Sequence, residues 1–531
     1  MYRNLFAVGG NTLLSRLTGF ARDLALAAVL GAGPVNDAFV VAFRLPNQFR
    51  AIFGEGAFNS AYVPSYARVL TSEGDEEAKR FSSQIFTLLL VSQLVLLALA
   101  YAFTPWFVAL MAPGFEAEPE KFALAVRMTR ITFPYLLFIT LVTLHSATLN
   151  AHGRFRVAAF APVVLNLAIL GFLGVAFRFP YVGFLGVAFR FPNAGEVASW
   201  GVLAGGVGQF ILVAGAARRR GLLETLAWPR LGADVRQFFG ALFPAVVSSA
   251  GVPIAIFADT IIASLLPTGI VSAIYYAERL YQLPIGVIGV AAGTVLLPEM
   301  SLRLARADLR GAEHAQNRTM AITIALSAPF CVAFLLIPEL ITRAAFLRGA
   351  FSAQAAANSA AVLAAYGLGL MPIVLIRSAV PSFQARGDTK TPMWISLGAI
   401  AVNVALKLAL YRTYGAVGIA LATAAGAWIN LGGLVALALR RGWMRPDATL
   451  AEVAAAAFCA SGLLAFAVEA GSARALDWAR SLPHLQGVAQ LAILAVGGAA
   501  VYAGALLAGL KLLDSPLLRW RPRAAADDGN S

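Results

Sequence analysis

The chain has 531 residues, of which 59% are hydrophobic and only 13% are charged, and its mean hydropathy is +0.75. Soluble proteins carry about 25% charged residues, so this composition excludes an ordinary soluble domain and predicts an all-α protein that crosses a membrane many times. The net charge of +14 would suggest a nucleic-acid partner in a soluble protein. Here the basic residues collect in alternate loops, as in cytoplasmic loops of membrane proteins, so we expect no nucleic-acid partner.

About fourteen apolar segments are long enough to span a membrane. The basic loops between them hold roughly two dozen Lys and Arg, against about nine in the other set, which places both termini in the cytoplasm. The first segment is too long and too charged for a cleavable signal. The segments cover 5–31, 35–52 (followed by an amphipathic piece, 57–70), 83–111, 124–149, 156–178, 198–217, 237–265, 269–297, 318–342, 354–378, 392–412, 414–438, 449–471 and 486–510.

The first twelve segments read as two copies of one six-helix unit. RDLALAAVLGAGPVNDAFVVAFR, from Arg22, resembles ADTIIASLLPTGIVSAIYYAER, from Ala258, and NAHGRF resembles QARGDT. Parallel repeats of this kind build two-lobed transporters whose substrate site lies between the lobes. We therefore expect an N-terminal lobe at 1–220, a C-terminal lobe at 221–445, and two additional helices with a cytoplasmic tail at 446–531.

Some features carry no predicted function. The decapeptide GFLGVAFRFP occurs at 171–180 and again at 183–192, and we interpret it as a local duplication that lengthens an external loop. Cys331 and Cys459 are two lone thiols in apolar segments, and the four histidines are scattered. Neither set has the spacing of a disulfide framework or of a metal site.

Charged residues interrupt the first apolar segment within SRLTGFARD. On a helical wheel, the polar residues of this segment share an arc of roughly 140°. A charge at mid-bilayer costs on the order of 3 kcal/mol, so this stripe must face other helices or a water-filled cavity. Its members are Asn11, Thr12, Ser15, Arg16, Gly19, Arg22 and Asp23.

Other segments also carry polar residues on one face. Residues three, four or seven apart share a face of a helix. These residues are Asp37, Arg44, Arg50 and Glu55 in and after the second segment, Asp259 in the seventh, Tyr275, Glu278, Arg279 and Gln282 in the eighth, and Asn403 and Lys407 in the eleventh. The sequence leaves open whether the acids form structural ion pairs, and whether Arg44 and Lys407 face a cavity.

The first, second and eighth segments together carry five arginines (Arg16, Arg22, Arg44, Arg50 and Arg279) against four acids (Asp23, Asp37, Glu55 and Glu278). Buried charge without partners is costly, and a surplus of guanidinium groups suits a phosphate or carboxylate ligand. The sequence contains no GxxxxGK[ST] loop, no HExxH and no GxSxG, so we expect a transporter of an anion rather than an enzyme, without an ATP site and without a cofactor. The membrane potential or a monovalent cation is then the expected energy source.

Three stretches also carry a family resemblance: SRLTGFARD with GPVNDAFVVAFRLPNQFR and GEGAFNSAYVPSY, YYAERLYQLPIGVIGVAAGTVLLPEMS, and ARGDTKTP. They resemble the MurJ (MviN) lipid II flippases of the multidrug/oligosaccharidyl-lipid/polysaccharide exporter superfamily, over essentially the whole chain. The stretch SFQARGD and the duplication at 171–192 depart from the family pattern.

The resemblance implies a two-lobed transporter that moves lipid II, undecaprenyl-pyrophosphate with a disaccharide-pentapeptide, by alternating access. It implies that Arg16, Arg22, Arg50 and Arg279 bind the pyrophosphate, and that Asp23, at the substrate site, Asp37 and Glu55 pair with arginines and help closure. The shared helix faces add six candidate cavity or gating residues: Ser15, Arg44, Asp259, Tyr275, Glu278 and Gln282. The expected location is the bacterial inner membrane, with lipid II, membrane lipids and peptidoglycan synthases as candidate partners.

Three rival interpretations remain. A flippase for another polyprenyl-pyrophosphate-linked glycan would need the same arginines. A drug antiporter for cations should carry a surplus of acids instead. A membrane enzyme acting on polyprenyl phosphates would need clustered acids or a histidine near a membrane face, whereas the acids here are dispersed over several segments.

Overall fold

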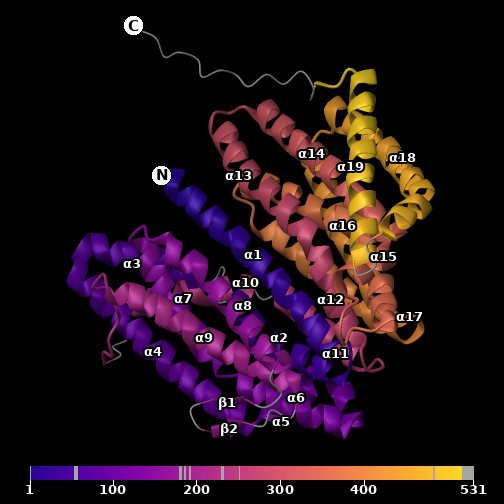
Figure 1. Ribbon diagram of the computed structural model, residues 1–531. Helices are drawn as coiled ribbons and strands as arrows, with labels where there is room; N and C mark the ends of the chain where they lie inside the picture. Colours follow the sequence, from indigo (N-terminus) through magenta and orange to yellow (C-terminus); the bar gives the residue numbers. More distant parts are fainter. Residues whose placement is uncertain are drawn as a thin grey trace. The chain divides into compact units, whose positions relative to one another are not determined.

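The computed structural model describes residues 2–52, 58–178, 182–184, 187–189, 193–228, 232–249, 251–481 and 485–516. Almost all of them are helical (Figure 1). The first part of the chain contains α1 (Tyr2–Leu30), α2 (Pro34–Ile52), α3 (Phe58–Glu73), α4 (Asp75–Ala102), α5 (Thr104–Met111), the 3₁₀ helix η2 (Pro113–Ala117), α6 (Pro119–Thr132), α7 (Tyr135–Ala151), α8 (Phe155–Arg178), the strands β1 (Val182–Phe184) and β2 (Val187–Phe189), and α9 (Ala194–Arg218).

The second part of the chain is also helical. It contains α10 (Ala233–Ser249), α11 (Gly251–Ser264), α12 (Ile270–Pro284), the π-helical turn η3 (Ile285–Gly289), α13 (Val290–Ala305), α14 (Leu309–Leu336), α15 (Pro338–Phe346), α16 (Ala353–Gln384), α17 (Lys390–Arg440), α18 (Ala448–Ala479) and α19 (Gln486–Leu512).

The all-α membrane fold is confirmed. Ten helices of the described part are long and apolar enough to cross a membrane, judged by length and composition. Each expected segment coincides with a helix or with a helix pair, and the expected break between 412 and 414 is a kink inside α17 at Gly415, where φ is 55°. The helix α2 continues through Pro46 to Ile52.

The chain divides into two compact units. The first unit comprises Met1–Tyr276 with Phe346–Asn358, and the second comprises Ala277–Ala345 with Ser359–Ser531. The boundary between them therefore falls inside α12. The three-part division expected from the sequence repeat follows a different criterion and stays a prediction.

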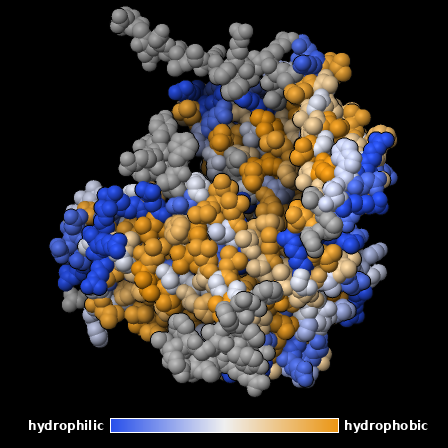
Figure 2. Space-filling view, in the orientation of Figure 1, coloured by the Kyte–Doolittle hydropathy of each residue, from blue (hydrophilic) through white to orange (hydrophobic). Residues whose placement is uncertain are grey.

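In the first unit, α7 packs on α4 and on α9, and α8 packs on α1 and on α9. An aromatic core that includes Phe58, Tyr62 and Phe238 joins α3 to α10. Along α4, the large side chains Val91, Val95 and Leu99 are exposed. Figure 2 shows hydrophobic surface along the flank of this unit and hydrophilic surface around α3. An apolar outer flank of this kind is what contact with lipid requires.

In the second unit, α18 and α19 form a hairpin that packs on α14. Their contact consists of small and aliphatic side chains around Ala328, Ala460, Leu464 and Tyr502. The Tyr502 hydroxyl donates to the Ala325 carbonyl at 2.7 Å, which satisfies a polar group that hydrocarbon would leave without a partner.

The two copies of the duplicated decapeptide have different structures. The first copy continues α8 as far as Arg178, whereas residues 183–184 and 187–189 of the second lie in the antiparallel strands β1 and β2, where Gly183 is opposite Ala188. The same residues are therefore helical where an existing helix extends into them and extended where none does, so tertiary context overrides local propensity.

Candidate functional site

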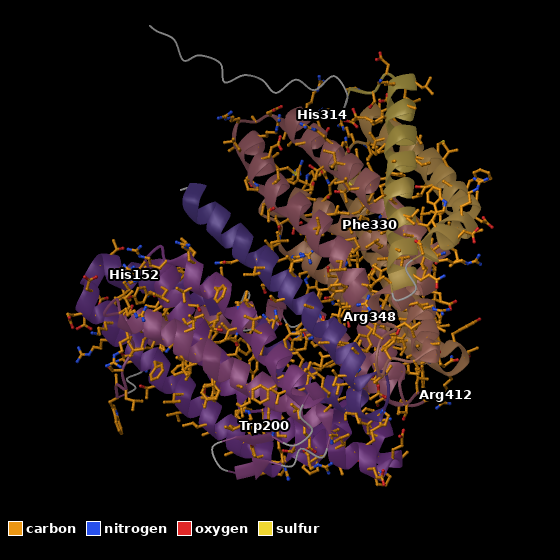
Figure 3. The ribbon with its side chains drawn as sticks, in the orientation of Figure 1. His152, Trp200, His314, Phe330, Arg348 and Arg412 are labelled. Carbon is orange, nitrogen blue, oxygen red and sulfur yellow. The ribbon has the colours of Figure 1, made fainter. Side chains whose placement is uncertain are left out.

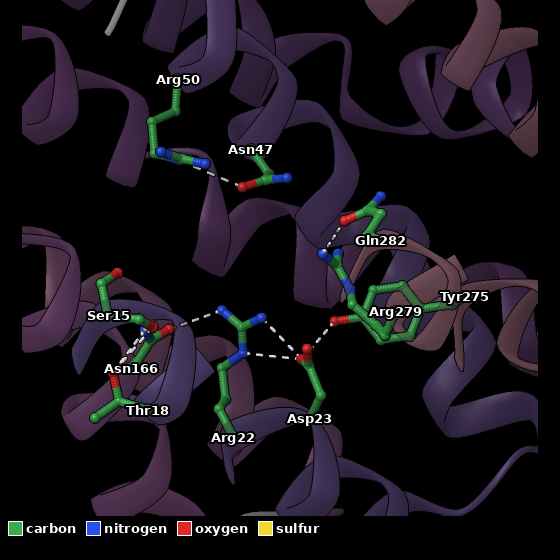
Figure 4. A network of polar contacts seen from close by, with 10 residues as sticks. All are labelled: Ser15, Thr18, Arg22, Asp23, Asn47, Arg50, Asn166, Tyr275, Arg279 and Gln282. Carbon is green, nitrogen blue, oxygen red and sulfur yellow. Dashed lines mark hydrogen bonds and ion pairs between the residues drawn. The ribbon is translucent and has the colours of Figure 1, made fainter. Parts of the chain in front are cut away.

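The polar face of α1 packs against α8 through Arg22. Arg22 as a whole residue is 8% exposed. Its Nε and Nη2 donate to Asp23 Oδ1 at 3.1 and 2.8 Å, and its Nη1 donates to Asn166 Oδ1 at 3.0 Å (Figure 4). The amide of Asn166 in turn donates to the Ser15 carbonyl and to Thr18 Oγ1. Gly19 lies beside this amide, and a Cβ there would be at an ordinary contact distance of 3.4 Å from Asn166 Nδ2.

The helix α12 contributes to the same network through Tyr275. The Tyr275 hydroxyl donates to Asp23 Oδ1 at 2.9 Å, so this carboxylate oxygen accepts from a residue of α1 and from one of α12 (Figure 4). A carboxylate held by a guanidinium and a hydroxyl is a strong, geometrically fixed arrangement. The network therefore fixes the position of the Arg22 guanidinium within the first unit.

Asp37 of α2 caps the first turn of α12. It is fully buried. Its Oδ2 accepts from the Gly269 amide at 2.7 Å, and its Oδ1 accepts from the amide of Ser272 at 2.9 Å and from the Ser272 hydroxyl. A carboxylate at a helix N-terminus satisfies amides that have no partner within the helix and interacts favourably with the helix dipole. Asp37 thus connects α2 to α12.

Lys121 of α6 lies beside Asp37 and is almost completely buried, with 3% of its surface exposed. Its Nζ lies 4.0 Å from Asp37 Oδ2, and it donates to Glu118 Oε1 at 2.8 Å and to Thr268 Oγ1 at 2.7 Å. The hydrogen bonds from Lys121 and Thr268 lower the pKa of Glu118. The Lys121 ammonium supplies Asp37 with a countercharge, and its hydrogen bond to Thr268 joins α6 to the turn between α11 and α12.

Arg44 of α2 contacts α11. Its Nη1 donates to Thr260 Oγ1 at 2.9 Å and to the Ile256 carbonyl at 3.2 Å. Asp259, the residue before Thr260, is half-buried on α11. The face shared by Asp37 and Arg44 on α2 is therefore directed toward α11 and α12.

Three of the candidate residues lie in the second unit, on the last two turns of α12. Gln282 Nε2 donates to Glu278 Oε1 at 3.0 Å, and Arg279 Nη1 donates to Gln282 Oε1 at 3.4 Å (Figure 4). The spacing expected for one face of a helix thus brings these three side chains together. On α17, Lys407 is also buried, and Asn403 on the same face donates to the Ala422 carbonyl.

The remaining candidates occupy different surroundings. Arg16 of α1 is exposed, and so are Leu13 and Leu17 beside it. Arg50, in the last turn of α2, donates from Nε to Asn47 Oδ1 at 3.4 Å (Figure 4). Glu55 lies outside the described residues.

Sequence reasoning missed several residues of these networks. Lys121 stands in EPEKF, which reads as a surface turn, and Thr268 and Ser272 are ordinary polar residues of a turn and a helix start. Their role depends on which helices meet, which one sequence does not show. Asn166 could have been singled out from the sequence, because an asparagine recurs at the corresponding position, Asn403, in the second repeat. Its Arg22 contact could have been suspected from a lone amide in an apolar helix.

The described residues contain no group of three or more His, Cys, Asp or Glu that could hold a metal ion. His145, for example, forms a hydrogen bond with Glu224. What the site offers instead is arginine, held in place by acids and amides on membrane helices. Fixed guanidinium groups in an apolar surrounding bind phosphate or carboxylate groups.

The family profile described as "Lipid II flippase MurJ" matches residues 26–482. A probable lipid II flippase MurJ from Rhizobium meliloti is 39% identical over 479 residues, which cover 90% of this chain and 87% of the relative. The lipid II flippase MurJ of Burkholderia cenocepacia is 34% identical over 520 residues, covering 95% and 97%. Among solved structures, "Lipid II flippase MurJ, inward closed conformation" has a TM-score of 0.78 at 23% identity and covers 96% of this chain and 99% of that one. The last comparison shows the same fold, and the profile and the relatives together show that this chain belongs to the lipid II flippase MurJ family.

Proposed function

We propose that this protein is a flippase that moves lipid II from the cytoplasmic to the outer face of the bacterial inner membrane by alternating access. Membership of the family supports the substrate. The observation that carries the chemistry is Arg22, a buried guanidinium in a membrane helix whose position is fixed by Asp23 and Asn166. A pyrophosphate crossing an apolar barrier needs such a group, because an unpaired anion there is very costly.

In this proposal, Arg16, Arg22, Arg50 and Arg279 bind the pyrophosphate, and Asp23 orients Arg22. The other candidate residues shape or close the site. Ser15 and Tyr275 belong to the Arg22 network, whereas Asp37 and Arg44 connect α2 with α11 and α12. Asp259, Glu278, Gln282 and Glu55 complete this set.

The energy source proposed is the membrane potential or the gradient of a monovalent cation. A potential of 100 mV supplies about 2.3 kcal/mol per charge, and an inside-negative potential drives an anion outward. The same potential returns the empty, positively charged binding site inward. No bound cofactor takes part in this cycle.

The proposed orientation places both termini in the cytoplasm, as the basic loops indicate. In that orientation, the turns between α1 and α2 and between α11 and α12 face outward, and lipid II enters from the cytoplasmic leaflet. The synthases that polymerise peptidoglycan on the outer side are the proposed protein partners.

The test is rescue of a bacterium depleted of its own lipid II flippase, together with exposure of lipid II on the outer face. Wild type is compared with Arg16→Ala, Arg22→Ala and Arg279→Ala at matched membrane levels. Arg412→Ala serves as the control, because Arg412 is an exposed arginine that contacts its neighbour Tyr411 (Figure 3). We expect the wild type and the control to rescue and the three site variants to fail.

Two results would contradict the proposal in different ways. Rescue by all three well-expressed site variants would show that these arginines do not bind the substrate. Failure of the well-expressed wild type to expose lipid II would move another polyprenyl-pyrophosphate-linked glycan to the front as the substrate.

A further inference from the structure

A cavity of about 330 Å³ lies within the first unit, lined mainly by α7 and α8, with one residue each from α2, α3 and α9. It is far larger than the ~10–15 Å³ that one water molecule requires. Apolar side chains, among them Val142, Phe155 and Pro162, form part of its wall. The rest of the wall is polar and consists of Arg50, Asn59, Thr143, Ser146, Asn150 and Gln209.

Gln209 of α9 presents an oxygen that has no partner among the described residues. The residue is 1% exposed, and its Nε2 donates to the Ala161 carbonyl at 2.9 Å. A carbonyl only accepts, so the NH₂ group must face Ala161, and this fixes which side of the amide carries the oxygen. Its Oε1 is buried and receives no hydrogen bond within the described part of the chain. Such an atom calls for an explanation, since buried acceptors in native proteins are normally satisfied.

Two further side chains of the cavity wall also offer hydrogen-bond acceptors. Asn150, near the end of α7, also has a buried Oδ1 that receives no hydrogen bond from the described residues. Thr143, two turns earlier on α7, uses its hydroxyl hydrogen on the Ile139 carbonyl at 2.9 Å, so its oxygen remains an acceptor toward the cavity. The wall thus offers three acceptors, and it suits an occupant that brings N–H or O–H donors.

We propose that this cavity binds a secondary amide of the substrate's head group, with Asn150, Gln209 and Thr143 as acceptors of its N–H and hydroxyl donors. The proposal rests on the proposed function and adds a subsite to it. Arg50 in the same wall places a positive charge beside the amide group, which suits a head group that also carries anions. An amide-rich head group could supply the donor from an N-acetylated sugar or from its peptide, and the test separates these two sources.

The variants remove two of the three acceptors, one at a time. Asn150→Leu removes the amide, and Thr143→Val keeps the shape of the side chain without its oxygen. The control is Ser199→Ala on α9, a buried serine that donates to the Gly195 carbonyl and does not line the cavity. Thermal unfolding of each purified full-length variant shows whether it is folded.

The probes are three lipids titrated against the full chain in nanodiscs: undecaprenyl-pyrophosphate with the disaccharide-pentapeptide, with the disaccharide alone, and with neither. We expect Asn150→Leu and Thr143→Val to weaken binding of the complete lipid about tenfold, as loss of one hydrogen bond would. Ser199→Ala should stay within threefold of wild type, and binding of the bare lipid should not change. Equal weakening with the disaccharide lipid assigns the amide to a sugar, and weakening only with the pentapeptide assigns it to the peptide.

The inference is overturned if both acceptor variants bind the complete lipid as wild type does, or if they weaken the bare lipid equally. If Asn150→Leu does not fold, Thr143→Val decides the question. Failure of the proposed function itself gives a different result: wild type would then bind the complete lipid no better than it binds undecaprenol without phosphate.

Discussion

Replacement of Lys121 by methionine should loosen the start of α12. Methionine keeps much of the lysine's length but removes the ammonium, which leaves Asp37 fully buried without its countercharge. Two unit charges 4 Å apart attract each other by about 4 kcal/mol at an effective dielectric constant of 20. Removal of one member of a buried pair typically costs about 3–5 kcal/mol. The hydrogen bonds from Nζ to Glu118 and Thr268 are lost as well.

Hydrogen exchange of the backbone amides that donate to Asp37 measures this effect. Gly269 and Ser272 donate their backbone N–H groups to this carboxylate, so their hydrogen exchange reports how often the contact opens. If opening becomes easier by about 3–5 kcal/mol, exchange should accelerate by roughly 10²–10⁴, since 1.4 kcal/mol is tenfold. Hydrogen exchange with mass spectrometry on a peptide that covers 265–275 measures this rate.

A matched control lies on the same helix. Arg127 of α6 pairs with Glu196 at 3.0 Å, but the Arg127 side chain is 53% exposed. Exposed pairs contribute only about 0–1 kcal/mol, so Arg127→Met should change exchange of the 265–275 peptide little. The double variant Asp37→Asn with Lys121→Met should lose less than the sum of the single variants, because it leaves no buried charge alone. If Lys121→Met exchanges within threefold of wild type, the countercharge does not hold the contact.

Two other predictions concern the backbone conformation of Gly349 and the carboxylate of Asp388, in the loop between α16 and α17. Gly349 has a φ of +58°, and a Cβ there would meet the Ala28 carbonyl oxygen at 2.2 Å, so Gly349→Ala should markedly lower the thermal unfolding midpoint. Gly221→Ala, at φ +69° with open space around it, should cost only about 1 kcal/mol, and equal loss in both variants would refute the steric argument. Hydrogen bonds from Thr391 lower the pKa of Asp388 to about 2, so its contribution to stability is complete above 3.8 and is lost as the pH falls through about 2. Thr391→Val should raise this pKa toward 3.8, as carboxyl-carbon NMR of the folded protein would show.

The sequence predicted the helices well, because most of them contain the long apolar run that is typical of a membrane-spanning helix. It also predicted which side chains lie on the same face of a helix, as the contacts among Glu278, Arg279 and Gln282 on α12 show. Helical periodicity is a local property, so one chain suffices to read it. The position of the breaks was harder to predict. The segment expected at 237–265 is divided into α10 and α11, and the one at 269–297 contains the turn η3.

The partners of the charged residues could not be predicted in the same way. Asp37 contacts the start of α12, more than 230 residues away in the chain, and Lys121 joins it from a segment that resembles a surface turn. Such contacts depend on helix packing, which the hydrophobic pattern of a single helix does not encode. The identities of the polar residues were visible in the sequence, but their pairing was not.

The pairing nevertheless bears on the question that the sequence left open, whether the acids serve only to neutralise arginines. Asp23 does contact Arg22. Asp37 instead caps α12 and has Lys121 as its ion-pair partner, while Arg44 donates to a hydroxyl and a carbonyl of α11. An acid that binds a helix start and a lysine is not available to cancel an arginine. Of the four acids Asp23, Asp37, Glu55 and Glu278, Asp37 thus has Lys121 as its ion-pair partner, which is consistent with an anionic substrate for the arginines.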